Sequence, residues 1–324
     1  MKELIKKIII ILGIKKEIYF LYSKLENLFL YKKLKEKYLK IFMSSSKSKE
    51  KYLEKIFKKN IGYEIDFSRE PRTFNEKIQF RKLYDDNPLY SICADKYRVR
   101  EYVKNKIGEE YLIPLYLVTD KLTEEQWEKL PNSFVAKANH NSGPVQIIKD
   151  KDKVNQKQII KELNNQLKLD YGILTMEKYY SDIPRKIIVE KFLKDNERTM
   201  LQDIKIHCFN DGKKRRCFFD LCSRESVQGE VFSVLHDENW NNLKVTAGNL
   251  DTRDYKKPKN LETLLKIAKK LSEDFDYVRV DLYNIDGKIY FGELTFCENS
   301  GFGKFTDESW DYKFGSYWKQ KKLK

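Results

Sequence analysis

Residues 278–296 (VRVDLYNIDGKIYFGELTF) constrain the fold of this chain most, because apolar and polar residues alternate along two segments around the turn sequence NIDG. This pattern is typical of a β-hairpin with one buried face. The hairpin carries two acids, Asp281 and Glu293, and its register decides whether they share a face. A two-residue Asp-Gly loop puts them on opposite faces. A three-residue loop, with Gly287 in the left-handed bulge position, pairs Glu293 with Arg279 and puts Asp281 diagonally beside it.

We adopt the three-residue loop, because diagonal neighbours lie about 7–8 Å apart, within reach of one divalent cation. Two carboxylates on rigid strands suit Mg²⁺, which takes its other ligands from water and phosphate. The alternative is a solvated face on which the acids only form salt bridges with Arg279 and Lys288. The apolar residues on the same strands favour the metal site; they are Tyr277, Tyr290, Leu294 and Phe296.

The net charge of +15 is concentrated in residues 1–60, where 17 lysines and 6 glutamates, with no Arg or Asp, give a balance of +11. The rest of the 324 residues carries about +4, and 41% of the chain is hydrophobic. A nearly neutral globular part, of one large or two interlocked domains, therefore accompanies a basic segment. Such a segment predicts an anionic neighbour, which is a membrane surface, a nucleic acid or an acidic polymer.

Residues 1–60 are predicted to be helical. The apolar run from Leu4 to Ile14 is interrupted by Lys6 and Lys7 and is too short to span a bilayer. No small-residue cleavage site follows it, as a secretory signal would require. Two interpretations stay open: an amphipathic segment on an anionic membrane, or an ordinary helical layer packed on the main domain. No nucleic-acid-binding module is recognisable in the segment.

The five cysteines are scattered without a C-x-x-C pair, which predicts neither a zinc site nor a disulfide framework and fits a reducing cytoplasm. Cys208 and Cys217 are expected to face each other across a hairpin as buried free thiols. The three histidines, at 140, 207 and 236, lack metal-ligand spacing.

Residues 133–150 (SFVAKANHNSGPVQIIKD) predict a strand, a loop of small residues and a returning strand. Lys137 projects from the first strand, and the loop can bend its backbone amides around phosphate oxygens. The loop is no Walker A motif, which runs G-x-x-x-x-G-K-[ST] into a helix. Taken alone, it is more simply a hairpin turn, with His140 bonded to its own backbone.

Other stretches add polar groups to apolar strands. Glu190 lies in the apolar strand predicted for residues 185–193, where its burial is costly unless it is paired or functional. Residues 203–220 predict a hairpin with Lys205 and His207 on one face. Residues 261–271 predict a helix, residues 233–248 an irregular segment and residues 300–303 a flexible loop.

The order Lys137, Glu190, Lys205, Asp281 and Glu293 resembles the ATP-grasp fold. More narrowly, residues from about 73 to 312 resemble the TupA-like ATP-grasp family, which is associated with bacterial surface-polymer synthesis of the teichuronopeptide type. The resemblance is carried by FNEKIQFRKLYDDNPLY, ADKYRVREYV, FVAKANHNSG and VRVDLYNIDGKIYFGELTF. It covers most of the chain.

The resemblance implies an α+β fold in which two subdomains clamp ATP. We expect a basic helical segment over 1–60, the first part of the core over 61–130, the small subdomain over 131–195 and the large subdomain over 196–324. The family pattern E-x-N at the metal strand is Glu293-Leu294-Thr295 here, so Thr295 offers one oxygen and no amide. By similarity, ATP is held by Lys137, Asn141, Ser142, Gly143, Glu190, Lys191, Leu193, Glu197 and Lys205, and Mg²⁺ by Asp281, Glu293 and Thr295.

The implied reaction is carboxylate activation by ATP, followed by attack of an amine on an acyl-phosphate. Arg224, in the polar run 223–226, is the candidate for stabilising the acyl-phosphate. A uronic acid or glutamate would suit the family's association with surface polymers, and the expected location is cytoplasmic or peripheral on the inner membrane face. Two alternatives differ in class: a glycosyltransferase or accessory polysaccharide-assembly protein, and a basic membrane-binding module with a non-catalytic nucleotide site.

Overall fold

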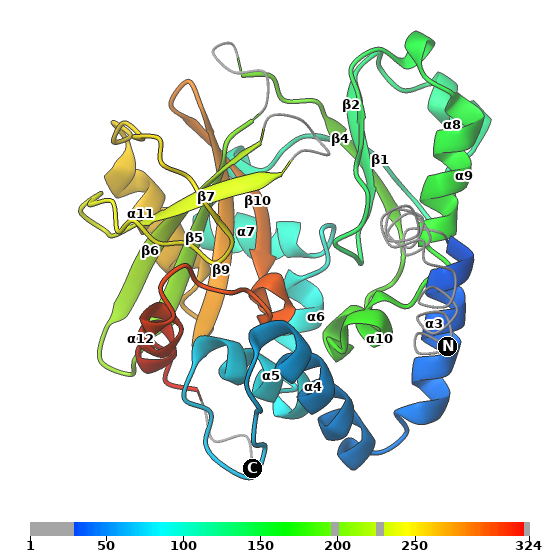
Figure 1. Cartoon of the computed structure of the whole chain (residues 1–324). Helices are drawn as coiled ribbons and strands as arrows, with labels where there is room; N and C mark the ends of the chain where they lie inside the picture. The colour runs from blue at the N-terminus through cyan, green and yellow to red at the C-terminus, as the bar shows by residue number, and fades with distance from the viewer. Residues whose placement is uncertain (1–28, 196–200, 225–229, 321–324) are drawn as a thin grey trace, which may run out of the picture.

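The computed structural model describes residues 29–195, 201–224 and 230–320. Two β-sheets stand side by side with helices packed around them (Figure 1). The small sheet has the strand order β1-β4-β2-β3 and the large sheet β10-β9-β5-β6-β7-β8. Within these residues, every strand pair is antiparallel apart from β7 with β8. The predicted α+β class is confirmed.

The strands of the small sheet are β1 (Leu115–Thr119), β2 (Phe134–Ala138), β3 (Gln146–Ile148) and β4 (Ile187–Lys191). Those of the large sheet are β5 (Asp203–Asn210), β6 (Arg215–Arg224), β7 (Val231–His236), β8 (Asn249–Leu250), β9 (Tyr277–Ile285) and β10 (Lys288–Thr295). The irregular segment predicted for residues 233–248 is therefore wrong in its first part. There β7 extends the sheet by pairing with β6.

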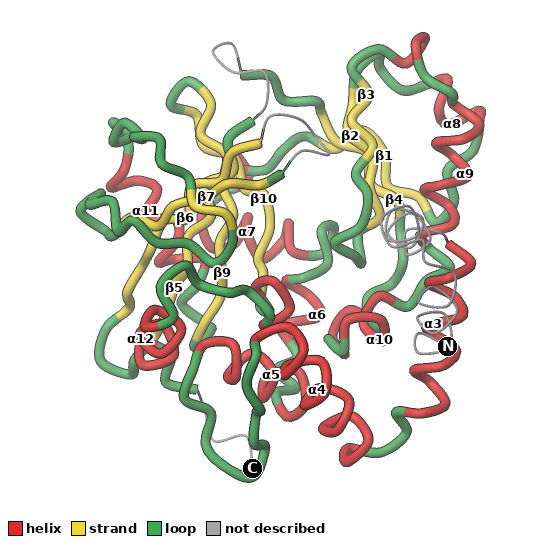
Figure 2. The backbone as a smooth tube through the Cα atoms, viewed as in Figure 1, coloured by secondary structure: helices red, strands yellow, loops and turns green. Residues whose placement is uncertain are grey.

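The helices before the large sheet are α3 (Phe29–Phe42), α4 (Ser46–Ile61), α5 (Phe74–Tyr84), α6 (Leu89–Cys93), α7 (Val99–Ile107), α8 (Glu124–Glu128), α9 (Gln156–Gln166) and α10 (Tyr171–Thr175). Two more follow, α11 (Leu261–Leu271) and α12 (Ser309–Tyr317). Short 3₁₀ turns cover Glu109–Tyr111, Lys151–Lys153, Lys178–Tyr180 and Glu298–Gly301. Figure 2 shows α4 and α5 near the lower end of the large sheet, with α6 beside it. No helix among the described residues combines the length and the apolar character needed to cross a bilayer.

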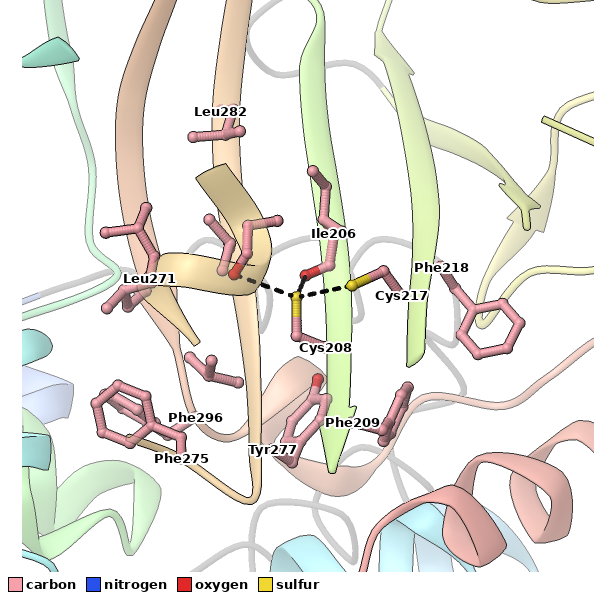
Figure 3. Packing of buried hydrophobic residues seen from close by; sticks show 14 of the residues in the cluster. Ile206, Cys208, Phe209, Cys217, Phe218, Leu271, Phe275, Tyr277, Leu282 and Phe296 are labelled. Carbon is pink, nitrogen blue, oxygen red and sulfur yellow. Dashed lines mark hydrogen bonds between the residues drawn. The ribbon is translucent and has the colours of Figure 1, made fainter. Parts of the chain in front are cut away.

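The main core lies on both faces of the large sheet. On one face, Ile206 and Cys208 of β5 pack against α11, where the Cys208 thiol lies 3.8 Å from the Ala268 carbonyl oxygen. Figure 3 shows Cys208 and Cys217 opposite each other on β5 and β6, with their sulfur atoms 3.7 Å apart. All five cysteines are buried free thiols, as predicted.

On the other face, aromatic side chains from β5, β9, α5 and α12 fill the lower half of the sheet. Phe74 of α5 makes edge-on contacts with Phe209, Tyr277 and Phe314. The upper half of the same face carries charged residues instead, so one sheet face is partly apolar core and partly a largely buried polar region.

The small sheet has its own core, in which Trp127 of α8 packs edge-on against Phe134 of β2 and apolar residues of α9 complete the cluster. Because β1 pairs with β4, the small sheet begins earlier in the chain than the boundary predicted at residue 131.

Arg81 fastens α5 to the first and last residues of the β9–β10 hairpin. Its side chain is 1% exposed, and Nη1 donates to the carbonyl oxygens of Tyr277 at 2.9 Å and Phe296 at 3.0 Å. Nη2 pairs with Asp276, and the guanidinium stacks over Trp318 at 4.3 Å from the ring centroid. A capping box between Thr73 and Glu76 opens α5.

Replacing Arg81 by Met should destabilise the protein by about 3–5 kcal/mol, because it leaves Asp276 and two carbonyl oxygens without their buried cation. Urea unfolding measures the change. Arg69→Met is the matched control, since that side chain is 83% exposed and its loss should cost less than about 1 kcal/mol. Equal effects of the two substitutions would show that Arg81 does not anchor the hairpin.

Candidate active site

A row of charged side chains crosses four strands of the large sheet. Glu293 of β10 pairs with Asp281 of β9, Asp281 pairs with Lys205 of β5, and Lys205 pairs with Asp220 of β6. Directly paired residues in antiparallel strands point to the same face. We call Glu293, Asp281, Lys205 and Asp220 the charged row.

The turn of the β9–β10 hairpin differs from the predicted one. Asp286 and Gly287 form a two-residue loop with φ values of 51° and 82°, as in a type I′ turn. The register then shifts between Phe291 and Glu293, so Gly292 is the extra residue of a β-bulge. The bulge, and not a three-residue loop, brings Glu293 directly opposite Asp281.

Glycine suits the bulge because the backbones approach closely there. A Cβ atom at Gly292 would lie 3.0 Å from the Asp281 carbonyl oxygen. The prediction that the two acids share a face is thus confirmed, but the predicted pairing of Glu293 with Arg279 is wrong. Arg279 pairs with Thr295 instead.

Arg279 holds the acids together. Its Nε and Nη2 lie 2.6 Å from the two carboxylate oxygens of Asp281, and Nη2 also lies 3.2 Å from Glu293. Nη1 forms a further ion pair with Glu298. The salt bridges with Arg279 that the alternative predicted are present, and Glu293 is 36% exposed. The face is not fully solvated, however, because Arg279 and Glu298 are buried and Asp281 is largely so.

Burial raises the pKa of the Asp281 carboxyl to about 6, against the lowering by Arg279. Burial works in the same direction on Glu293, but Lys96, Arg279 and Lys205 together hold its pKa below the ordinary value. Two neighbouring carboxylates with opposite shifts are a common mark of a functional site.

The donor set fits Mg²⁺. Asp281 and Glu293 supply hard oxygen ligands from adjacent strands, and the Thr295 hydroxyl lies 3.1 Å from Glu293 Oε1. No group of three or more His, Cys, Asp or Glu side chains in the described ranges is arranged to hold a metal ion. Mg²⁺ binds through one or two carboxylates and takes further ligands from phosphate and water.

Lys205 lies between Asp281 and Asp220 in the charged row. Within the described part of the chain its ammonium group makes no hydrogen bond or ion pair. Burial and Arg279 lower its pKa, whereas Cys222, Asp281 and Asp220 raise it, with a net increase. Lys205 is therefore a cation available to an anionic ligand beside the two acids.

The loop after β2 is tied down at its first residues. Asn139 is fully buried and donates through Nδ2 to Asp95 at 2.7 Å and to the Pro184 carbonyl oxygen at 2.9 Å. The Asn141 side chain accepts from the Gly143 amide at 3.1 Å, so that amide is engaged within the loop. His140 Nε2 lies 3.2 Å from the Leu169 carbonyl oxygen; the predicted bond to its own backbone is wrong.

Lys137 and Glu190 form a buried ion pair between β2 and β4, with Nζ 2.6 Å from Oε2. The ion pair with Lys137 thus offsets the unfavourable free energy expected for burying Glu190 in an apolar strand. Lys191 follows it at the end of β4, where its amide donates to the Pro114 carbonyl oxygen, and Leu193 is buried just beyond.

Lys96 connects the two sheets. Its Nζ lies 2.5 Å from the Asn141 carbonyl oxygen in the loop and 3.9 Å from Glu293 Oε2 on β10. Burial and Lys137 lower its pKa, whereas Glu293 and Glu190 raise it. Charges from both sheets therefore converge on this one ammonium group. Sequence reasoning placed Lys96 only at the start of a basic helix, although it lies in the ADKYRVREYV segment.

A model of the TupA-like ATP-grasp family matches residues 76–319. The chain belongs to this family. A comparison with curated protein sequences finds no match.

Solved structures similar to this TupA-like chain include two D-alanine–D-alanine ligases. The Helicobacter pylori enzyme is 16% identical with a TM-score of 0.40, covering 71% of this chain and 62% of its own. The Bacillus anthracis enzyme complexed with ATP is 16% identical with a TM-score of 0.36, covering 63% and 55%. N5-carboxyaminoimidazole ribonucleotide synthetase from Thermus thermophilus is 10% identical with a TM-score of 0.40, covering 70% and 52%. The chain thus spans between half and two thirds of the length of these proteins.

Two predicted site residues of the TupA-like chain are not placed at the site. Glu197 lies outside the described residues, and Arg224 ends β6 opposite Val231, with its side chain outside the description. The loop predicted to be flexible at residues 300–303 is held by Lys82, whose Nζ donates to the Ser300 carbonyl oxygen at 2.6 Å. Besides Lys96, sequence reasoning missed Glu298, and it named Arg279 only as a strand partner and salt-bridge partner of the acids. The only sequence signal for them was a charge beside an apolar strand.

His140 should make the stability of the protein depend on pH. Burial lowers the pKa of its imidazole to about 4, against about 6.5 in an unfolded chain. As the pH falls from 6.5 towards 4, the unfolded chain binds a proton that the native state does not, so stability decreases. The expected loss from this residue at pH 4.5 is about 2–3 kcal/mol.

Urea unfolding at pH 7 and pH 4.5 measures this loss. The His140→Asn variant should show a smaller difference between the two pH values than the natural chain. His207 and His236, whose pKa values burial also lowers, contribute equally in both proteins. An identical pH dependence of the two proteins would contradict the assignment to His140.

Proposed function

We propose that the protein is an ATP- and Mg²⁺-dependent ligase that joins a carboxylate to an amine through an acyl-phosphate. The observation that carries this proposal is the position of Lys96 between the loop Asn139–Gly143 and Glu293. This position of Lys96 supports a single site formed by the lysine of the small sheet and the acids of the large sheet. Membership of the TupA-like ATP-grasp family supports the same reaction.

In this proposal, cations from both sheets hold the triphosphate of ATP. Lys205 supplies one charge from the large sheet, and Lys137 supplies another from β2 after exchanging Glu190 for phosphate. The loop around Ser142 closes over the phosphates. The backbone at Lys191 and Leu193, next to Glu190, contacts adenine. Glu197 is assigned to the ribose. Asp281 and Glu293, with Thr295 beside them, hold Mg²⁺, which when bound neutralises charge on the phosphoryl oxygens.

The chemistry requires no side-chain nucleophile. An oxygen of the substrate carboxylate attacks the γ-phosphorus, and the bond from that phosphorus to the bridging oxygen of ADP breaks. The amine then attacks the carbonyl carbon of the acyl-phosphate, phosphate leaves with the electron pair of the C–O bond, and the amine proton is released with it to solvent. The chain's residues position the two reactants and compensate the negative charge.

Arg279 is placed to stabilise the acyl-phosphate, whereas the side chain of Arg224 lies outside the described residues. The Arg279 guanidinium lies among Asp281, Glu293 and Glu298, next to the position proposed for the γ-phosphate. A metal ion bound to Asp281 and Glu293 would weaken their ion pairs with Arg279. N–H groups of the Arg279 guanidinium would then be able to donate to an oxyanion. We therefore assign the catalytic arginine to Arg279 in place of Arg224.

The biological setting that we propose is the synthesis of a capsule or another cell-surface polysaccharide, at the cytoplasmic face of the membrane. Its support is the association of the family with surface polymers. A uronic acid or a glutamate is then the expected carboxylate, with an amine as the acceptor.

The purified protein should release ADP and phosphate from ATP only when both a carboxylate and an amine are present. Asp281→Asn should lower this rate at least about 100-fold, because it removes a charged metal ligand at the γ-phosphate. Asp286→Asn, in the turn of the same hairpin, should leave the rate unchanged. Binding of a UDP-sugar without ATP turnover would instead favour a glycosyltransferase.

Lys205→Met should weaken binding of ATP by at least about tenfold, since it removes one charge-assisted contact to phosphate. Isothermal titration calorimetry with ATP and Mg²⁺ measures the affinity. Lys213→Met is the matched control, because Lys213 lies exposed in the turn of the same β5–β6 hairpin. Unchanged ATP affinity in Lys205→Met would remove Lys205 from the proposed site.

A further inference from the structure

The helix α3 exposes a stripe of large apolar side chains. Each lies three or four residues from another member of the set, and we call them the apolar stripe: Leu30 (68% exposed), Leu34 (48%), Tyr38 (48%), Ile41 (62%) and Phe42 (60%). At 100° per residue they cover an arc of about 120° on one side of the helix. The Tyr38 and Phe42 rings lie together, with centroids 4.4 Å apart. Five of the nine exposed large hydrophobic residues of the described chain therefore lie on this one helix.

The opposite side of α3 is fixed to the protein. Leu39 is 1% exposed and Met43 is buried, and α3 packs against α10. Glu36 is buried on the same side, where it accepts hydrogen bonds from Lys40 at 2.8 Å and from the Asp170 amide at 3.2 Å. Figure 1 shows α3 at the outer edge of the molecule beside α10. The apolar stripe is thus held facing outward.

Lysines flank the apolar stripe on both sides. On a helical projection, Lys37, Lys33 and Lys40 lie along one border of the stripe and Lys35 lies along the other. Glu36, the single acid of α3, is buried and forms ion pairs with Lys33 and Lys40, so that Lys35 and Lys37 lie on the borders beyond these pairs. An apolar face bordered by lysines is the arrangement of helices that lie in the surface of an anionic bilayer.

We infer that α3 docks the protein on an anionic lipid surface, with the apolar stripe in the headgroup region and the lysines on the lipid phosphates. The charge of residues 1–60, which is +11, selects this partner over an uncharged apolar protein surface. The helix is too short and too rich in lysine to cross the bilayer, so it lies on the membrane. The inference is independent of the proposed ligase activity.

The test uses the full chain and sedimentation with two kinds of vesicle: phosphatidylcholine alone, and phosphatidylcholine mixed with phosphatidylglycerol in a two-to-one ratio. The natural chain should bind the mixed vesicles and lose binding as salt is raised. The triple variant Leu30→Ser, Leu34→Ser, Ile41→Ser should bind at least about tenfold more weakly, since it removes the apolar contact. These side chains are exposed, so urea unfolding should be unchanged.

Two further variants separate charge from apolar contact. Lys35→Gln with Lys37→Gln should weaken binding to the mixed vesicles at least about fivefold, because each lysine near an anionic surface contributes to the attraction. Tyr116→Ser with Tyr312→Ser, which removes exposed aromatic residues elsewhere, should have no effect.

A direct measurement of depth completes the test. A tryptophan introduced by Leu34→Trp should show blue-shifted emission with the mixed vesicles and quenching by brominated lipid, whereas one introduced by Tyr312→Trp should not. Full binding by the Leu30, Leu34 and Ile41 triple variant would overturn the inference and assign lipid binding to another part of the chain. Absence of binding to either vesicle, or a dimer in light scattering that the triple variant dissociates, would also overturn it.

Discussion

Three carboxylates placed around one guanidinium govern the architecture of the site. Asp281, Glu293 and Glu298 converge on Arg279 at one face of the large sheet. Buried like charges repel one another and are tolerated only with a cation among them. Arg279 supplies that cation from within the same strand, and Lys96 supplies a second from the segment before α7. The protein therefore holds its acids in place before any ligand arrives.

The same sheet face changes from core to site along each strand. On β5 the side chains pass from Phe209 through His207 to Lys205, and on β9 from Tyr277 through Arg279 to Asp281. The apolar ends are covered by α5 and α12, while the charged ends face Lys96 and the small sheet. A rigid, fully packed lower half thus positions the charged upper half, as a site on strands requires.

The two sheets are joined at the site by polar contacts. Lys96 bridges them there, and Asn139 ties the loop of the small sheet to Asp95. Their hydrophobic cores are separate, since Trp127 and Phe134 belong to one and Phe74 and Tyr277 to the other. Separate cores with a shared polar boundary allow the sheets to adjust around a ligand without disrupting either core.

Local patterns of apolar and polar residues in the sequence determined where most secondary-structure elements form. The hairpin in residues 278–296 and the helix over 261–271 are both found where they were predicted, because short-range periodicity and turn chemistry decide them. The motif order also identified the family that the comparison with family models confirms.

Register and long-range pairing were decided only by the tertiary structure. No local sequence pattern predicted the bulge at Gly292. A glycine is needed there because the backbone of the neighbouring strand β9 lies too close for a side chain. Lys96 and Glu298 are ordinary charges in the sequence. Lys96 becomes part of the site only when it meets Glu293, about 200 residues later in the chain, and Glu298 only when the turn after β10 brings it back to Arg279. The sequence by itself therefore determined which secondary structures form and which chemistry they carry. Packing decided which of those charges share one buried space, because burial and proximity are properties of the assembled sheets.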